Sequence, residues 1–100
     1  MRVIKIELDF LIGPIIKDVF DTSKMEIVTG VSLIDNNNEI NALNDEISTL
    51  YSSFYEYDNP CKLNKEKLLS LLEKLISLLN KINDGSFIVE DLASPFLKNL

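Results

Sequence analysis

The stretch that decides the fold is residues 64–82, which read NKEKLLSLLEKLISLLNKI. Lysines at positions 67, 74 and 81 recur every seven residues and mark one polar face of a helix. The apolar residues cover far more than one stripe: Leu68, Leu69, Leu71, Leu72, Leu75, Ile76, Leu78, Leu79 and Ile82. A helix that is apolar over so wide an arc is buried on more than one side. This stretch therefore predicts a helix that other elements cover from several directions.

A second helix is predicted just before the first. Its apolar residues recur at spacings of three and four over five turns: Ile40, Leu43, Ile47, Leu50, Phe54 and Tyr57. Asn36, with Glu39 three residues later, resembles a capping box, and Pro60 marks the end because proline cannot continue a helix. The connection between the two helices is short, so we expect 36–58 and 64–84 to pair as an antiparallel hairpin.

The remaining segments are shorter and less regular. Residues 3–10 alternate between apolar and polar side chains, which is typical of a half-buried antiparallel strand. Gly13-Pro14 then breaks this pattern, and the apolar residues of 14–21 favour a short helix. Residues 25–33 fit a strand and an irregular apolar loop equally well. Residues 86–90 fit a last strand, and Pro95 favours an irregular tail.

These elements predict a single domain, 1–100, of helix-dominant α+β class. The helical hairpin would pack on a small antiparallel sheet built from about 3–10 and 86–90, with 25–29 as an optional third strand. The alternative is an all-α bundle in which 3–20 is helical.

Composition excludes several classes of function. The chain has 100 residues, no histidine and one cysteine, so histidine-dependent nucleophilic catalysis, histidine-ligated metals and an internal disulfide are ruled out. Charges interrupt the apolar residues at the N-terminus, and no window is long and apolar enough to cross a membrane, so we expect a cytoplasmic protein. The net charge of −6 argues against binding to nucleic acid or to an anionic membrane.

Carboxylates are the remaining candidates for chemistry, and they favour no catalytic or metal site. Glu39 pairs with Glu46, and Asp45 with Glu56, at two and three helical turns, but on the side of the helix opposite the apolar stripe. Acid–base catalysis needs a buried carboxylate with a shifted pKa. The oxygen-rich run 35–39 lacks the central glycine of an EF-hand loop and fits a turn and helix cap better. We expect no enzyme activity, no metal and no cofactor.

The charge pattern favours a protein partner. Residues 26–60 hold seven acidic residues and no lysine or arginine, and a surface of one sign steers association with a partner of the opposite sign. Tyrosine adds rigid contact area at binding surfaces. The candidate partner-binding residues are Glu39, Asp45, Glu46, Tyr51, Tyr55, Glu56 and Asp58. Two alternatives stay open: the tyrosines pack at the edge of the core, or a separate acidic face at Glu7, Asp9, Asp18 and Asp21 is used.

Three segments carry a resemblance to a known family: residues 6–15, the region of Tyr51 and Tyr55, and residues 83–87, which read NDGSF. Together they resemble small bacterial immunity proteins of contact-dependent growth inhibition systems. The resemblance implies a cytoplasmic protein that binds the C-terminal toxin domain of its cognate delivered protein, often a basic nuclease, and blocks it. It transfers no set of contact residues.

The leading hypothesis is therefore an immunity protein that covers the active site of a basic toxin domain with an acidic, tyrosine-bearing surface. The alternative is a structural or regulatory module that self-associates through the leucine-rich helix and has no toxin partner. A third hypothesis is a small enzyme that uses carboxylates alone. The sequence leaves the oligomeric state and the identity of the toxin open.

Overall fold

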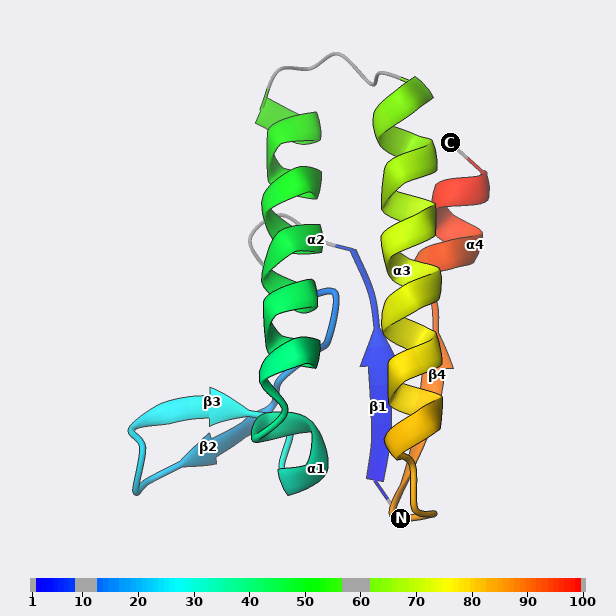
Figure 1. The fold of residues 1–100 in the computed structure, drawn as a ribbon. Helices are drawn as coiled ribbons and strands as arrows, with labels where there is room; N and C mark the ends of the chain where they lie inside the picture. Colours follow the sequence, from blue (N-terminus) through cyan, green and yellow to red (C-terminus); the bar gives the residue numbers. More distant parts are fainter. Residues whose placement is uncertain (1, 9–12, 57–61, 100) are drawn as a thin grey trace.

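The computed structural model describes the backbone of residues 2–8, 13–56 and 62–99, and their side chains except those of 53–56 and 62–64. Two long helices lie side by side in front of a small sheet, and a short hairpin projects from one end of the molecule (Figure 1). The elements in chain order are β1 (Arg2–Ile6), β2 (Val19–Asp21), β3 (Glu26–Val28), α1 (Ser32–Asp35), α2 (Asn38–Glu56), α3 (Lys62–Ile82), β4 (Phe87–Asp91) and α4 (Ala93–Lys98).

The helical hairpin is confirmed. The helices α2 and α3 run in opposite directions and pack along their length, with ends within about two residues of the predicted ones. The wide apolar arc of α3 is covered as its sequence predicts. Its fully buried leucines are Leu68, Leu72, Leu75 and Leu79. They lie in one core cluster with α2, with the inner residues of β1 and β4, and with Ala93 and Leu97 of α4.

The expected antiparallel sheet of 3–10 and 86–90 is wrong in direction. Strands β1 and β4 are parallel, with Ile4 opposite Val89 and Ile6 opposite Asp91. Helix α3 ends beside the start of β1, and the turn after α3 sends β4 in the same direction as β1 (Figure 1). The sequence pattern of a half-buried strand does not specify this direction, because it depends on where the preceding helix ends.

The expected helix over 14–21 is also wrong. Ile15 makes an antiparallel bridge to Ile6, and Val19–Asp21 forms β2, which pairs with β3 in a separate antiparallel hairpin. The strand expected near 25–29 exists as β3 but does not join β1 and β4. The all-α alternative is excluded by these strands.

A hydrogen bond to α2 and others to residues 5–7 hold residues 13–16 in a non-helical conformation. The backbone N–H of Ile15 donates to the buried side chain of Asn44 at 2.9 Å, while Glu7 and Pro14 are joined by a backbone bond of 2.8 Å. Gly13 has φ +84°, and a Cβ there would overlap the carbonyl oxygen of Glu7. The segment is thus tied to β1 on one side and to α2 on the other.

Helix ends differ from the sequence expectation at two places. The cap of α2 is Asn37, whose side chain accepts from the N–H of Ile40 at 3.0 Å, and not Asn36. The tail is not irregular, because α4 begins at Ala93. Pro95 lies in the first turn of this helix, where no intrahelical bond to its nitrogen is needed, and Asp91 accepts from the N–H groups of Ala93 and Ser94.

Candidate partner-binding surface

The outer face of α2 carries the described part of the predicted acidic surface. Its apolar stripe turns Ile40, Leu43 and Ile47 into the core, so the opposite side of the helix faces solvent. Glu39, Asp45 and Glu46 are all exposed. Only Asp45 lies opposite the stripe, as predicted. The other two flank it, because each precedes a residue of the stripe by four positions. Among the described residues none of these three carboxylates has an ion-pair or hydrogen-bonding side-chain partner. They are available to a partner molecule.

Tyr51 does not belong to this surface. Its side chain is 3% exposed and lies in the core cluster, so the expectation of a surface tyrosine at this position is wrong. Tyr51 follows Asn44 by two helical turns, and both residues are buried on that side of the helix. The buried arc of α2 is therefore wider than the apolar stripe alone. The side chains of Tyr55 and Glu56, and the whole of Asp58, lie outside the described residues.

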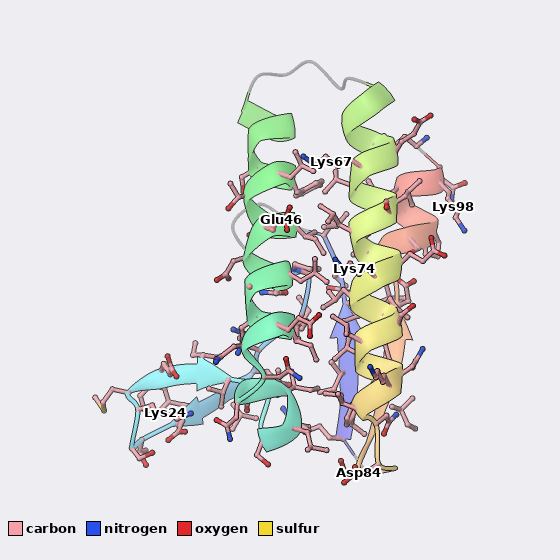
Figure 2. The ribbon with its side chains drawn as sticks, viewed as in Figure 1. Lys24, Glu46, Lys67, Lys74, Asp84 and Lys98 are labelled. Carbon is pink, nitrogen blue, oxygen red and sulfur yellow. The ribbon has the colours of Figure 1, made fainter. Side chains whose placement is uncertain are left out.

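A shallow groove of about 460 Å³ runs beside the acidic residues. Its lining is Ala42, Asp45, Glu46, Thr49, Leu50 and Lys67. Lys67 comes from α3, and Figure 2 shows Glu46 and Lys67 on the same side of the helical hairpin. Among the described residues, the groove thus has a carboxylate wall from α2 and one cation, Lys67, from α3.

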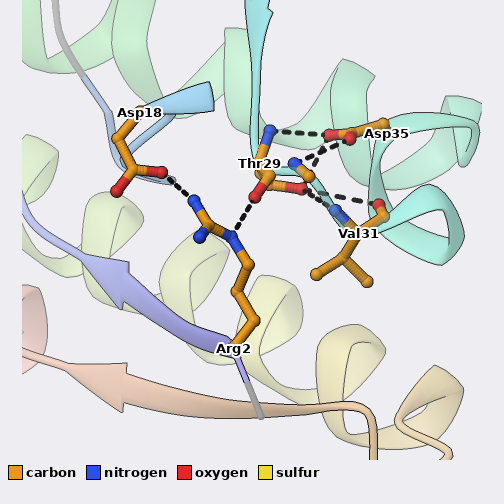
Figure 3. A network of polar contacts seen from close by, with 6 residues as sticks. Arg2, Asp18, Thr29, Val31 and Asp35 are labelled. Carbon is orange, nitrogen blue, oxygen red and sulfur yellow. Dashed lines mark hydrogen bonds and ion pairs between the residues drawn. The ribbon is translucent and has the colours of Figure 1, made fainter. Parts of the chain in front are cut away.

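Asp35 lies in the same acidic run of sequence but serves the fold. One carboxylate oxygen accepts from the N–H and the hydroxyl of Thr29, at 3.0 and 2.7 Å, and the other accepts from the N–H of Gly30 at 3.1 Å (Figure 3). Thr29 is fully buried, and its hydroxyl also accepts from the N–H of Val31. Asp35 therefore joins β3 to α1, and its carboxylate is already occupied.

The alternative acidic face is partly neutralised by the chain itself. Asp18 pairs with the guanidinium of Arg2, which also donates to the carbonyl oxygen of Thr29 (Figure 3). Asp21 accepts from the hydroxyl and the N–H of Ser23, and the hydroxyl bond lowers its pKa below 3.8. Glu7 is partly buried, and Asp9 lies outside the described residues. Two described carboxylates of this face, those of Asp18 and Asp21, are therefore already hydrogen-bonded within the chain.

The β2–β3 hairpin contributes an apolar surface that the sequence did not reveal. Phe20 and Ile27 are opposite each other and are 56% and 57% exposed, although the expected helix over 14–21 would have buried Phe20. Ile27 and Asp45 also line one groove of about 290 Å³ between the hairpin and α2. Only a prediction that β2 and β3 pair as strands would have placed Phe20 and Ile27 side by side on one exposed face.

The described residues contain no group of three or more acidic or cysteine side chains placed to hold a metal ion. None of the helices in this part of the chain is long and apolar enough to cross a membrane. The chain matches no protein-family model, no curated protein and no solved structure.

Proposed function

We propose that this chain is an immunity protein of a contact-dependent growth inhibition system, which binds a basic toxin domain in the cytoplasm and neutralises it. The observation that carries the proposal is the set of three exposed carboxylates at Glu39, Asp45 and Glu46, which no other described residue pairs with. Such carboxylates can replace the phosphates of a nucleic-acid substrate in a cationic active site. The resemblance of residues 6–15 and 83–87 to this class of protein supports the same role.

The β2–β3 hairpin beside α2 indicates that the ligand of these carboxylates is a protein and not a small cation. Phe20 and Ile27 expose an apolar pair, and Ile27 shares a groove with Asp45. Protein interfaces combine a few apolar anchors with charges that select and orient the partner. A toxin domain that presents both basic and apolar side chains fits this combination.

The proposal is tested by co-expression of this chain with the C-terminal domain encoded immediately upstream of its gene. We expect that domain to stop growth when expressed alone, and this chain to restore growth and to co-purify with it. A neighbour that leaves growth unaffected would contradict the proposal. So would a toxic neighbour that this chain neither binds nor neutralises.

A matched pair of variants then locates the interface. The triple variant E39Q/D45N/E46Q removes three charges from the outer face of α2. The control E66Q/E73Q/E90Q removes three charges from exposed residues of α3 and β4. We expect growth rescue to weaken in the first variant and to persist in the second. Equal rescue by both would place the toxin elsewhere on the molecule.

A further inference from the structure

The face of the helical hairpin that holds Glu46 is divided lengthwise into two rows of opposite charge. Glu39 and Glu46 are seven residues apart on α2 and so lie on one side of that helix. Lys67, Lys74 and Lys81 follow the same spacing on α3, and all three are exposed. Figure 2 shows Glu46, Lys67 and Lys74 on the same side of the molecule, and Glu46 and Lys67 line one groove.

The two rows do not neutralise each other within one copy. None of these two glutamates and three lysines makes an ion pair with another described residue. Apolar side chains separate the rows. Leu50 lies one turn beyond Glu46, and Leu71 and Leu78 lie one turn beyond Lys67 and Lys74. All three leucines pack on the core but remain partly exposed.

This arrangement is complementary to itself. A twofold axis that lies in the plane of the face and runs parallel to the helices places α2 of one copy against α3 of the other. The acidic row of each copy then lies against the lysine row of the other, so this contact occurs twice. The partly exposed leucines between the rows of one copy face those of the other. The other twofold axis in that plane, perpendicular to the helices, would set like charges together. Most homodimers have twofold symmetry, so that each contact occurs twice.

We propose that this face binds a second copy of the chain, with the Glu39–Glu46 row of each copy against the Lys67–Lys74–Lys81 row of the other. The charge complementarity of the two rows selects this occupant and fixes the direction of the helices. A second copy meets both rows with opposite charge, whereas a basic partner pairs with the acidic row alone. The proposal does not depend on the proposed function.

Charge reversal on one row at a time tests the arrangement. The variant E39K/E46K makes the whole face basic, and K67E/K74E makes it acidic, so each variant alone should repel its own copies. We expect sedimentation equilibrium to show a concentration-dependent dimer for the native chain, and a dissociation constant at least about tenfold higher for each variant. An equimolar mixture of the two variants should restore the dimer, because each reversed row then meets an opposite one.

Controls separate the face from net charge and from misfolding. The variant K5E/K17E changes net charge as much as K67E/K74E does but alters exposed lysines elsewhere, and it should dimerise like the native chain. If K67E/K74E fails to fold, the milder variant K67Q/K74Q takes its place, and we expect it to weaken the dimer as well. A native chain that stays monomeric, a dimer that persists in both reversed variants, or folded variants that fail to pair when mixed would each overturn the proposal.

The second copy and the proposed toxin would use the same glutamates and would therefore exclude each other. Where the toxin-binding role also holds, adding the toxin domain to the native dimer should yield a complex with one copy of each chain. A monomeric native chain that still rescues growth would remove the dimer and leave the toxin-binding role intact.

Discussion

Asp35 ends α1 with both carboxylate oxygens occupied, whereas Asp45 on the outer face of α2 has a carboxylate that no described residue pairs with. Both belong to the same stretch of sequence without lysine or arginine. The difference lies in what surrounds them. The turn before α1 leaves backbone N–H groups that need an acceptor, while Asp45 lies in the middle of α2, where the backbone N–H groups bond within the helix. Acidic residues in one run therefore separate into those that build the fold and those available to a partner.

The largest expected effect is on the first group. Asp35→Ala removes the acceptor for Thr29 and Gly30 and leaves a buried polar group without its partner. We expect the free energy of unfolding to fall by on the order of 3 kcal/mol. Urea unfolding of the purified chain measures this. If Asp35→Ala lowered the free energy of unfolding no more than the substitution of an exposed acidic residue does, the hydrogen bonds around Thr29 would contribute little to stability.

Two adjacent residues on α2 sharpen the comparison. Asn44→Ala leaves the buried N–H of Ile15 without an acceptor, which should lower the free energy of unfolding by roughly 2 kcal/mol. Asp45→Ala, one position further, should change it by less than about 0.5 kcal/mol because the side chain is exposed. The two variants are compared in the same unfolding experiment. Similar losses in both would mean that Asp45 also has a structural role.

The smallest effect concerns Asp21, at the end of β2, and Asp84, between α3 and β4. Hydrogen bonds from Ser23 to Asp21 and from Ser86 to Asp84 favour the charged carboxylates and lower both pKa values below 3.8. Because these pKa values fall on folding, the stability they contribute is present above the ordinary pKa and is lost as pH falls through the lowered one. NMR titration of the two carboxyl groups measures the shifts. The Ser23→Ala and Ser86→Ala variants should return each pKa toward its ordinary value.

The helical hairpin could be predicted because the spacing of apolar residues over 40–57 and 68–82 is long and regular. The direction of β4 could not, since it depends on where α3 ends in space. Residues 14–21 misled the prediction because Ile15, Ile16, Val19 and Phe20 suit a helix as well as extended chain, and the bond from Ile15 to Asn44 comes from a distant element. Short apolar runs are ambiguous for this reason.

Only part of the candidate surface could be predicted, because helical periodicity is visible in the sequence but contacts from distant elements are not. Helical periodicity places Glu39, Asp45 and Glu46 outside the apolar stripe, and all three are exposed. The same periodicity set Tyr51 beside the stripe, but Tyr51 lies in the core cluster, and Asn44 on the same side of the helix bonds to the N–H of Ile15. The exposed Phe20–Ile27 pair depends on a hairpin that the sequence analysis did not predict.

We propose that the exposed acids of α2 bind a partner and do not support the fold. The test measures the affinity of E39Q/D45N/E46Q for the proposed toxin domain, together with the free energy of unfolding of the same variant. We predict affinity at least tenfold weaker, about 1.4 kcal/mol, with the free energy of unfolding unchanged to within about 0.5 kcal/mol. Native affinity in this variant, or a loss of affinity that merely follows a loss of stability, would contradict the claim.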